Sequence, residues 1–164
     1  MDLEQTGPVI ELREARQEDL AEIVRLLADD PLGGSQECDQ NPLPVAYCDA
    51  LAAIAEDPNN EVWVAALAGQ IVGVLQLTFI PSLTHTGSWR AQIEGVRVAS
   101  EYRGQGVGTQ LMHWAIDRAG KNHCRIVQLT MDRRREEAGA FYERLGFTAT
   151  HEGFKQEIDP ENGG

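Results

Sequence analysis

The sequence predicts a single α/β domain whose sheet is mixed and mostly antiparallel. Apolar, β-branched segments first follow one another with the spacing of a hairpin, and later alternate with segments of helical periodicity. The length of 164 residues fits one domain of ordinary size. Hydrophobic residues make up 42% of the chain and charged residues 24%, a balance that supports a real core. We therefore interpret residues 1–164 as one domain with its core at about residues 9–158.

The first half of the chain predicts two helices and three strands. In order, we expect a strand at residues 9–14, helices at 18–28 and 45–56, and the two strands of a hairpin at 61–67 and 70–80. Leu20, Ile23 and Leu27 recur at three- and four-residue intervals, which gives the first helix an apolar face. A short turn at residues 68–69 joins the hairpin. Residues 29–44 are rich in Gly, Pro and Asp and form a loop long enough to suggest a function.

The second half of the chain predicts strands that alternate with helices. In order, we expect a strand at residues 92–98, a helix at 106–119, a strand at 126–130, a helix at 134–145, and a final hairpin of 148–151 and 154–158 that would close the sheet. Residues 81–90 are expected to form a polar loop before the first of these strands. Gly120 is expected to stop the helix that precedes it, with Arg118 and Lys121 at the negative end of the helix dipole.

Composition excludes several classes of function. The net charge of -12 argues against a nucleic-acid partner, because binding to phosphates needs a basic surface. No apolar segment is long enough for a membrane span, and the first residues lack a secretion signal, so we expect a cytoplasmic protein that does not bind a membrane. The three cysteines form no C-x-x-C pair and the four histidines have no metal-ligand spacing. We therefore predict no metal.

The segment Arg103-Gly104-Gln105-Gly106-Val107-Gly108-Thr109 joins a predicted strand to a predicted helix and has the features of an anion-binding loop. The helix lacks a clear Ser, Thr, Asp or Asn cap, so its first N–H groups keep no side-chain acceptor at the positive end of the dipole. The glycines leave room for an approaching anion, and Arg103 adds a permanent positive charge. This combination predicts a binding site for a pyrophosphate.

Two other phosphate-binding motifs do not fit this loop. A P-loop would end in Gly-Lys-Ser/Thr, which the loop lacks. A dinucleotide-binding loop would need a third glycine where Thr109 stands, and too little chain follows to complete such a fold. The remaining alternative is a glycine-rich turn that merely connects strand to helix.

The stretch from Val96 to Gly108 resembles the acyl-CoA-binding motif of the GNAT superfamily of N-acetyltransferases, in which a strand leads to Arg/Gln-x-x-Gly-x-Gly/Ala at a helix start. A second block, Phe141-Tyr142-Glu143-Arg144-Leu145-Gly146-Phe147, resembles the family's helix that ends in Phe-Tyr-x-x-x-Gly-Phe. The two blocks and the expected elements also occur in the family's order. The resemblance implies a GNAT-like fold, in which helices flank a split sheet and acetyl-CoA, the co-substrate, enters between two parting strands.

The resemblance also implies roles for individual residues. The backbone of Val96 and Val98 would pair with the pantetheine arm, and Tyr142 would protonate the leaving thiolate. Arg135 stands where the family commonly has an asparagine that contacts the coenzyme. The full set of residues expected to bind acetyl-CoA is Val96, Arg97, Val98, Arg103, Gly104, Gln105, Gly106, Val107, Gly108, Thr109 and Arg135.

Glu94 is the candidate general base that would take the proton of the acceptor amine, directly or through a water. The alternation of a strand predicts that its side chain lies on the same side as Val96 and opposite Ile93. Partial burial in a cleft would raise the pKa of Glu94 toward a useful range. The alternative, an ordinary exposed glutamate on a strand, stays open.

Together these features predict an enzyme that transfers an acetyl group from acetyl-CoA to a primary amine, by direct transfer in a ternary complex. A small-molecule amine is favoured because the loops at 29–44 and 81–91 would close the acceptor site. Two alternatives remain: a protein acetyltransferase acting on a lysine or an N-terminus, and a module that senses acyl-CoA without turnover. A covalent route through Cys124 is discounted, because the neighbouring His123 would point to the opposite face of its strand. A homodimer would fit the family, although no residue indicates one.

Overall fold

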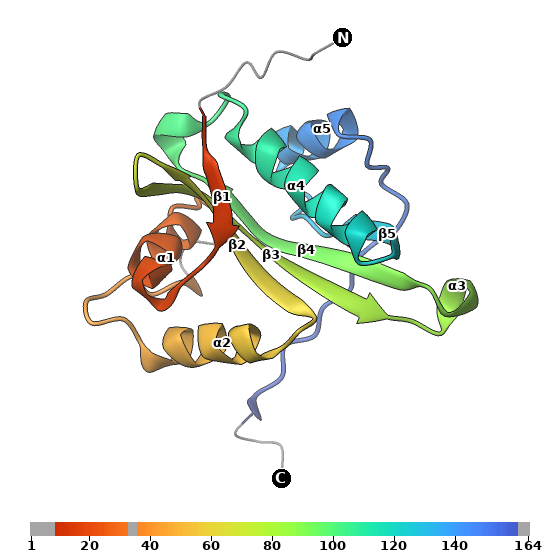
Figure 1. Ribbon diagram of the computed structural model, residues 1–164, viewed down its shortest axis with the longest axis horizontal. Helices are drawn as coiled ribbons and strands as arrows, with labels where there is room; N and C mark the ends of the chain where they lie inside the picture. Colours follow the sequence, from red (N-terminus) through yellow and green to blue (C-terminus); the bar gives the residue numbers. More distant parts are fainter. Residues whose placement is uncertain (1–8, 33–35, 161–164) are drawn as a thin grey trace. The chain divides into compact units, whose positions relative to one another are not determined.

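The computed structural model describes residues 9–32 and 36–160, and Figure 1 shows the arrangement of its elements. The chain forms two compact units, Met1–Leu129 and Thr130–Gly164. Every strand of the described residues lies in the larger unit, and the smaller unit contains the helix α5 (Glu136–Arg144).

A five-stranded sheet with the order β1-β2-β3-β4-β5 forms the centre of the larger unit. Its strands are β1 (Glu11–Glu14), β2 (Asn60–Leu67), β3 (Gln70–Pro81), β4 (Trp89–Val98) and β5 (Cys124–Leu129). The first four strands pair antiparallel with their neighbours, whereas β4 and β5 pair parallel. The predicted mixed, mostly antiparallel sheet is therefore confirmed.

Helices cover both faces of this sheet (Figure 1). They are α1 (Leu20–Ala28), α2 (Val45–Glu56) and α4 (Val107–Lys121), whereas the short α3 (Thr84–Gly87) lies in the turn between β3 and β4. Ile23 of α1 packs with the buried Val64 of β2. The neighbouring Trp63 instead stacks on Trp114 of α4, with 4.9 Å between the ring centroids. Because successive side chains of a strand point to opposite faces, these two contacts define an α1 face and an α4 face.

The core consists of aliphatic side chains on both faces of the central strands. On the α4 face, Leu111 is fully buried and stands close to Gly73 of β3. On the α1 face, Leu20 and Val24 pack with Leu51 of α2. α1 and α2 therefore pack against each other as well as against the sheet, which fixes where the loop between them begins and ends.

The loop predicted at residues 81–90 is much shorter in the structure. β3 continues to Pro81 and β4 already begins at Trp89, so that only the turn around α3 connects them. The register extends the ladder to the pairs Ile80↔Arg90 and Pro81↔Trp89. Pairing of these backbone groups overrides the polar composition of the segment, because a ladder satisfies donors and acceptors that a loop would leave to water.

Two further predictions are wrong in their details. α4 does not stop at Gly120, because the N–H of Asn122 donates to the carbonyls of Arg118 and Ala119 at 3.1 Å each and carries the helix to Lys121. The described residues 148–158 form no strand, so the expected final hairpin is absent from them. Phe154 and Ile158 are 93% and 82% exposed, and a hairpin is not stable without a buried face.

The other predicted elements are confirmed with small shifts at their ends. The first strand begins at Glu11 rather than residue 9, and the first helix opens as a 3₁₀ turn at Gln17–Asp19. The hairpin of β2 and β3 turns at Ala68 and Gly69, both of which have positive φ. Among the described helices, none combines the length and apolar character needed to cross a bilayer.

Candidate active site

β4 and β5 pair along only the first part of β4. Their parallel register runs from Trp89↔Cys124 to Ile93↔Leu129, where β5 ends. β4 continues to Val98, so residues 94–98 have β3 on one side and no strand on the other within the described chain. Such an edge offers backbone N–H and C=O groups to an extended ligand. This is the parting of strands that the sequence resemblance implies.

The glycine-rich loop follows directly after this edge. A 3₁₀ turn at Ser100–Tyr102 leads into it, and Gly104 and Gly106 have φ of +72° and +86°, a left-handed conformation that favours glycine. Gly106 is the N-cap of α4 and provides no side-chain acceptor for the first N–H groups of the helix. A Cβ at either glycine would meet no atom within 4 Å. The start of α4 is therefore open to an anion, as predicted for a pyrophosphate site.

The guanidinium of Arg103 makes its contacts with Val98 and Asp29 rather than with the start of α4. Its Nε donates to the carbonyl of Val98 at 3.2 Å, and its guanidinium lies 3.8 Å from the carboxylate of Asp29 at the end of α1. Both side chains of this pair are about half exposed, and such pairs contribute at most about 1 kcal/mol. A phosphate approaching the loop would therefore compete readily with Asp29 for Arg103.

Arg97 forms an ion pair with a carboxylate that lies far from it in the sequence. Its guanidinium donates to Asp30 at 2.9 Å and to the carbonyl of Val96 at 2.8 Å. The side chain of Asp30 is only 1% exposed. The side chain of Arg97 thus anchors the beginning of the loop after α1 to β4, and the expected coenzyme contact of this residue would be through its backbone.

A bulge in β4 changes the predicted orientation of Glu94. The register pairs Val74 with Arg97 and Gln76 with Glu94, so two residues of β3 span three residues of β4. Glu94 therefore shares the α1 face with Arg97, opposite Ile93 as predicted but not beside Val96. Gly95 has φ of +61°, which a bulge of this kind requires of the extra residue. Glu94 is exposed, so the expected partial burial is not present.

A row of polar side chains crosses four strands next to Glu94 on the α1 face. The register aligns Asn60 with Thr78, Thr78 with Gln92, and Gln92 with Gln128. Thr78 Oγ1 donates to Asn60 Oδ1 at 3.1 Å, and Gln128 Nε2 donates to Gln92 Oε1 at 2.7 Å. Sequence analysis did not find this polar row, because its members lie on four different strands and only the register brings them together.

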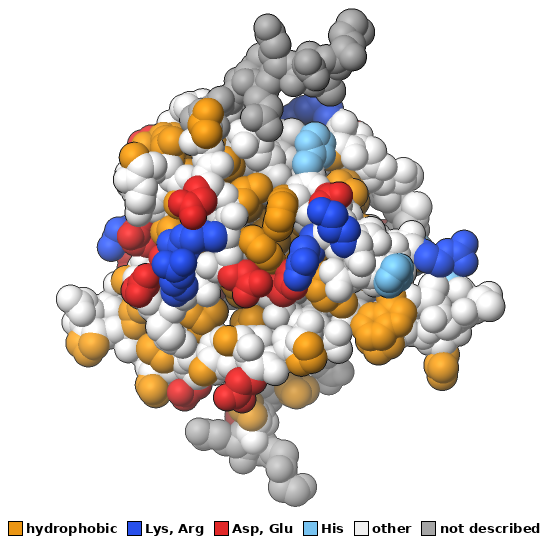
Figure 2. Space-filling model, in the orientation of Figure 1, with side chains coloured by type: hydrophobic (Ala, Val, Ile, Leu, Met, Phe, Trp, Pro, Cys, Tyr) orange, Lys and Arg blue, Asp and Glu red, His pale blue; other side chains and the backbone are white. Residues whose placement is uncertain are grey.

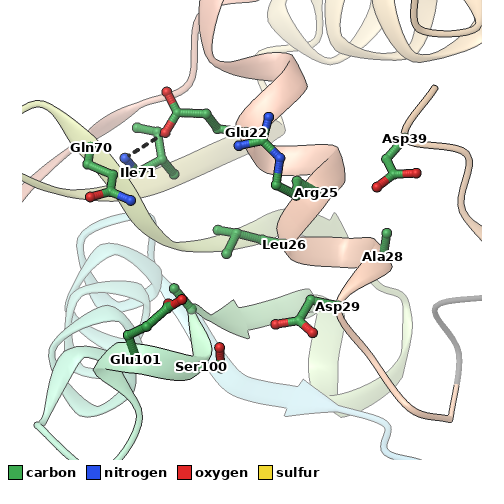
Figure 3. Close-up of a pocket in the computed structure, with 11 residues that line it drawn as sticks. Glu22, Arg25, Leu26, Ala28, Asp29, Asp39, Gln70, Ile71, Ser100 and Glu101 are labelled. Atoms are coloured by element: carbon green, nitrogen blue, oxygen red, sulfur yellow. Dashed lines mark hydrogen bonds between the residues drawn. The ribbon is translucent and has the colours of Figure 1, made fainter. Parts of the chain in front are cut away.

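A cavity of about 500 Å³ lies between α1 and the 3₁₀ turn at Ser100–Tyr102 (Figure 3). Its charged lining residues are Glu22, Asp29, Asp39 and Glu101 against the single Arg25. The carboxylate of Glu22 accepts a hydrogen bond from the N–H of Ile71 at 3.0 Å. The excess of carboxylates repels phosphate groups, so this cavity does not suit the phosphates of a coenzyme.

In the smaller unit, Tyr142 lies on α5 in a cluster of aromatic rings. Its ring centroid is 5.3 Å from that of Phe141 and 6.0 Å from that of Phe147. The N–H of Phe147 donates to the carbonyl of Tyr142 at 3.0 Å, where Gly146 with φ of +92° follows the helix. Arg135 immediately precedes α5. The block Phe141–Phe147 thus folds as one local structure, and the catalytic role of Tyr142 stays a prediction.

Cys124 does not suit a covalent route. Burial raises the pKa of the half-buried Cys124 thiol, which lowers its reactivity as a nucleophile at neutral pH. This agrees with discounting a covalent route through that residue. No group of three or more His, Cys, Asp or Glu side chains in the described ranges is arranged to hold a metal ion.

Residues 20–147 match the Acetyltransferase (GNAT) family, and this range contains the parted strands, the glycine-rich loop and Tyr142. The chain therefore belongs to that family and is an acyltransferase of the N-acetyltransferase type, whose co-substrate is acetyl-CoA.

Acidic and basic side chains are interspersed over the face seen in Figure 2.

Two of the following three similar proteins are named acetyltransferases. The aminoalkylphosphonate N-acetyltransferase of Salmonella typhimurium is 32% identical over 149 residues, which cover 90% of this chain and 91% of the relative. A solved structure of a protein from Bacillus halodurans, described as a transcriptional regulator, is 51% identical and superposes with a TM-score of 0.89 over 92% of this chain and all of that one. A putative acetyltransferase from Agrobacterium tumefaciens is 30% identical, with a TM-score of 0.75 over 91% of this chain and all of that one.

Proposed function

We propose that this protein transfers an acetyl group from acetyl-CoA directly to the primary amine of a small molecule, within a ternary complex. The observation that carries the proposal is that the free edge of β4 leads straight into the uncapped start of α4. The edge at residues 94–98 suits the amide groups of a pantetheine arm, which would pair with it as an added strand. The helix start suits the pyrophosphate.

The proposed reaction moves three protons. Glu94 accepts a proton from the acceptor ammonium, directly or through a water, and the free amine attacks the carbonyl carbon of the thioester. The new N–C bond forms, the C–S bond breaks, and Tyr142 donates a proton to the departing thiolate. The nitrogen of the new amide loses its second proton to solvent, from which Tyr142 regains one, so that the net proton released is the one taken by Glu94. Because Glu94 is exposed on the α1 face, it is accessible to an acceptor that approaches from that side.

Contacts at both ends of the loop after α1 support a small acceptor. Asp29 pairs with Arg103 of the glycine-rich loop, Asp30 pairs with Arg97 of β4, and the hydroxyl of Tyr47 donates to Glu37 at 2.6 Å. A loop held in this way narrows the acceptor side, whereas a peptide substrate needs an open groove. The relative from Salmonella typhimurium, named for aminoalkylphosphonates, also supports a small amine. Protein acetylation is the alternative.

An acyl-CoA sensor without turnover is the second alternative. The Bacillus halodurans relative that is described as a transcriptional regulator makes this alternative worth testing. The net charge of -12 opposes direct binding to DNA, since nucleic-acid affinity depends on cationic side chains.

Release of free thiol from acetyl-CoA tests the proposal. The enzyme is assayed against a panel of aminoalkylphosphonates, amino acids, polyamines, aminoglycosides and peptides, with the Tyr142→Phe and Glu94→Gln variants in parallel. We expect release that depends on a small amine and falls about 100-fold in either variant, the size typical of losing a general acid or base. Calorimetry with coenzyme A should show unchanged binding in Glu94→Gln.

The outcomes separate the alternatives. Turnover confined to peptides would identify a protein acetyltransferase. Coenzyme binding without any turnover would identify a sensor. If coenzyme A does not bind at all, the glycine-rich loop is only a turn and the proposal fails.

A further inference from the structure

The α1 face of the sheet contains an arginine that no described residue neutralises. Arg90 shares this face with Gln92 and Glu94, since the three alternate along β4, and it pairs with Ile80 and Ile126 of the flanking strands. Its side chain is half-buried, and its buried Nε has no hydrogen-bond partner. Within the described residues it makes no ion pair.

Other arginines that contact the sheet of the same unit behave differently. Arg13 donates to Asp19 at 2.7 and 2.8 Å, Arg97 donates to Asp30 at 2.9 Å, and Arg118 donates to Glu61 at 3.0 Å. With 26 acidic and 14 basic residues, the chain has no shortage of carboxylates. The Nε of Arg97 is also buried without a partner among the described residues, but its guanidinium holds Asp30. In the part of the chain that the structure describes, Arg90 has neither an acceptor at its buried Nε nor a carboxylate partner, so it points to a partner that comes from outside the chain.

The surroundings of Arg90 suit a polar ligand. Gln92, two residues along β4, belongs to the polar row that crosses the sheet from Asn60 to Gln128. Glu94, another two residues along, is the proposed base. The face thus offers a cation at one end, amide donors and acceptors in the middle, and a carboxylate at the other end.

We infer that the acceptor amine also carries an anionic oxygen group, a phosphonate, phosphate or carboxylate, and that Arg90 binds this group. The inference rests on the proposed function, because it places the amine at Glu94. The Cα atoms of Arg90 and Glu94 are about 13 Å apart, four residues at the spacing of a strand. Both side chains are long and shorten this gap, so that a molecule whose amine and anion are a few bonds apart fits between them. The planar fork of a guanidinium binds such oxygen pairs in two parallel hydrogen bonds.

Matched acceptors test this inference. The value of kcat/KM is measured for 2-aminoethylphosphonate, O-phosphoethanolamine and β-alanine, and for propylamine as the amine without an anion. We expect the wild type to favour at least one anionic amine over propylamine by 10-fold or more, about the effect of a charge-assisted hydrogen bond. Arg90→Gln should reduce this preference about 10- to 100-fold, and Arg90→Lys should restore part of it. The three anionic amines show which oxyanion the site takes.

Arg125→Gln is the matched control. Arg125 precedes Ile126 on the neighbouring strand, so it faces away from Arg90, and it is exposed. This variant should keep the wild-type preference, and melting temperatures check that all three variants fold. Equal turnover of propylamine and the anionic amines by the wild type would overturn the inference, as would an equal loss on both by Arg90→Gln.

Failure of the proposed function would look different. If no amine is acetylated, calorimetry with the same anionic amines in the presence of coenzyme A decides the matter. Binding that is lost in Arg90→Gln and kept in Arg125→Gln supports an anion site at Arg90 even without catalysis. Absence of binding in the wild type overturns the inference.

Discussion

Glu61 of β2 forms a partly buried ion pair that connects the sheet to α4. It accepts hydrogen bonds from Arg118 Nε at 3.0 Å and from Trp63 Nε1 at 2.7 Å, and its side chain is 10% exposed. Arg118 also lies 5.8 Å above the ring of Trp63. Burial alone would raise the pKa of Glu61, but the hydrogen bonds from Arg118 and Trp63 outweigh burial and lower it. Hydrogen bonds thus hold this ion pair in one geometry, unlike an exposed ion pair at the surface.

We expect Arg118→Met to lower the free energy of unfolding by about 1 to 3 kcal/mol, because it leaves a buried carboxylate without its partner. Lys121→Met on the same helix removes only the exposed pair with Asp117, and should change stability by less than about 0.5 kcal/mol. Urea unfolding of both variants measures the difference. Equal effects would mean that Glu61 gains nothing specific from Arg118.

α4 approaches the sheet most closely at Gly73 of β3. A Cβ at this position would lie 2.8 Å from Leu111 Cδ1 and 3.2 Å from Val107 Cγ1. Both side chains are fully buried, and Val107 is the first residue of α4. The closeness of this contact sets the position of the helix start that is proposed to hold the pyrophosphate.

Gly73→Ala should therefore lower the free energy of unfolding by about 1 to 3 kcal/mol through overpacking, and should raise the KM for acetyl-CoA. Gly120→Ala on α4 is the control, since a Cβ at Gly120 would meet nothing within 4 Å. That substitution should stabilise the protein by up to about 1 kcal/mol, because alanine favours a helix over glycine, and should leave KM unchanged. Thermal unfolding and steady-state kinetics measure both effects. A normal KM in Gly73→Ala would separate the helix position from coenzyme binding.

At the scale of elements, the sequence predicted the features that depend on residues close together along the chain. The hairpin of β2 and β3 follows from the turn at residues 68–69, and the glycine-rich loop follows from its own composition. The bulge in β4 was not predicted, although Gly95 inside a strand is the usual sign of one. The contact of Arg97 with Asp30 and the polar row depend on register and on residues far apart in sequence. The hydrophobic periodicity of a single segment contains no information on such contacts between segments.

The whole molecule is strongly acidic, with a net charge of -12, and arginines hold several of its carboxylates, among them Asp19 and Glu61. Hydrogen bonds from Arg13 lower the pKa of Asp19 below its ordinary value of 3.8. The pKa of Glu61 is likewise below its ordinary 4.5, because the hydrogen bonds of Arg118 and Trp63 outweigh burial. A lowered pKa in the folded state means that the unfolded chain binds protons first as the pH falls. Each carboxylate therefore stabilises the fold above its unfolded pKa, and this contribution is lost as the pH falls through the folded pKa.

We expect the free energy of unfolding to be insensitive to these two groups above about pH 5 and to fall steeply below about pH 4.5. The Asp19→Asn, Glu61→Gln double variant should be less stable than the wild type at pH 7 and should lose less stability on acidification, so that the two curves approach each other as the pH falls. Glu18→Gln, in the same turn as Asp19 but with a 73% exposed side chain, should keep the wild-type slope. Urea titrations from pH 3 to pH 7 provide the curves. Parallel curves for the wild type and the double variant would show that other carboxylates control the acid response, since Asp19 and Glu61 would then titrate alike in the folded and unfolded chain.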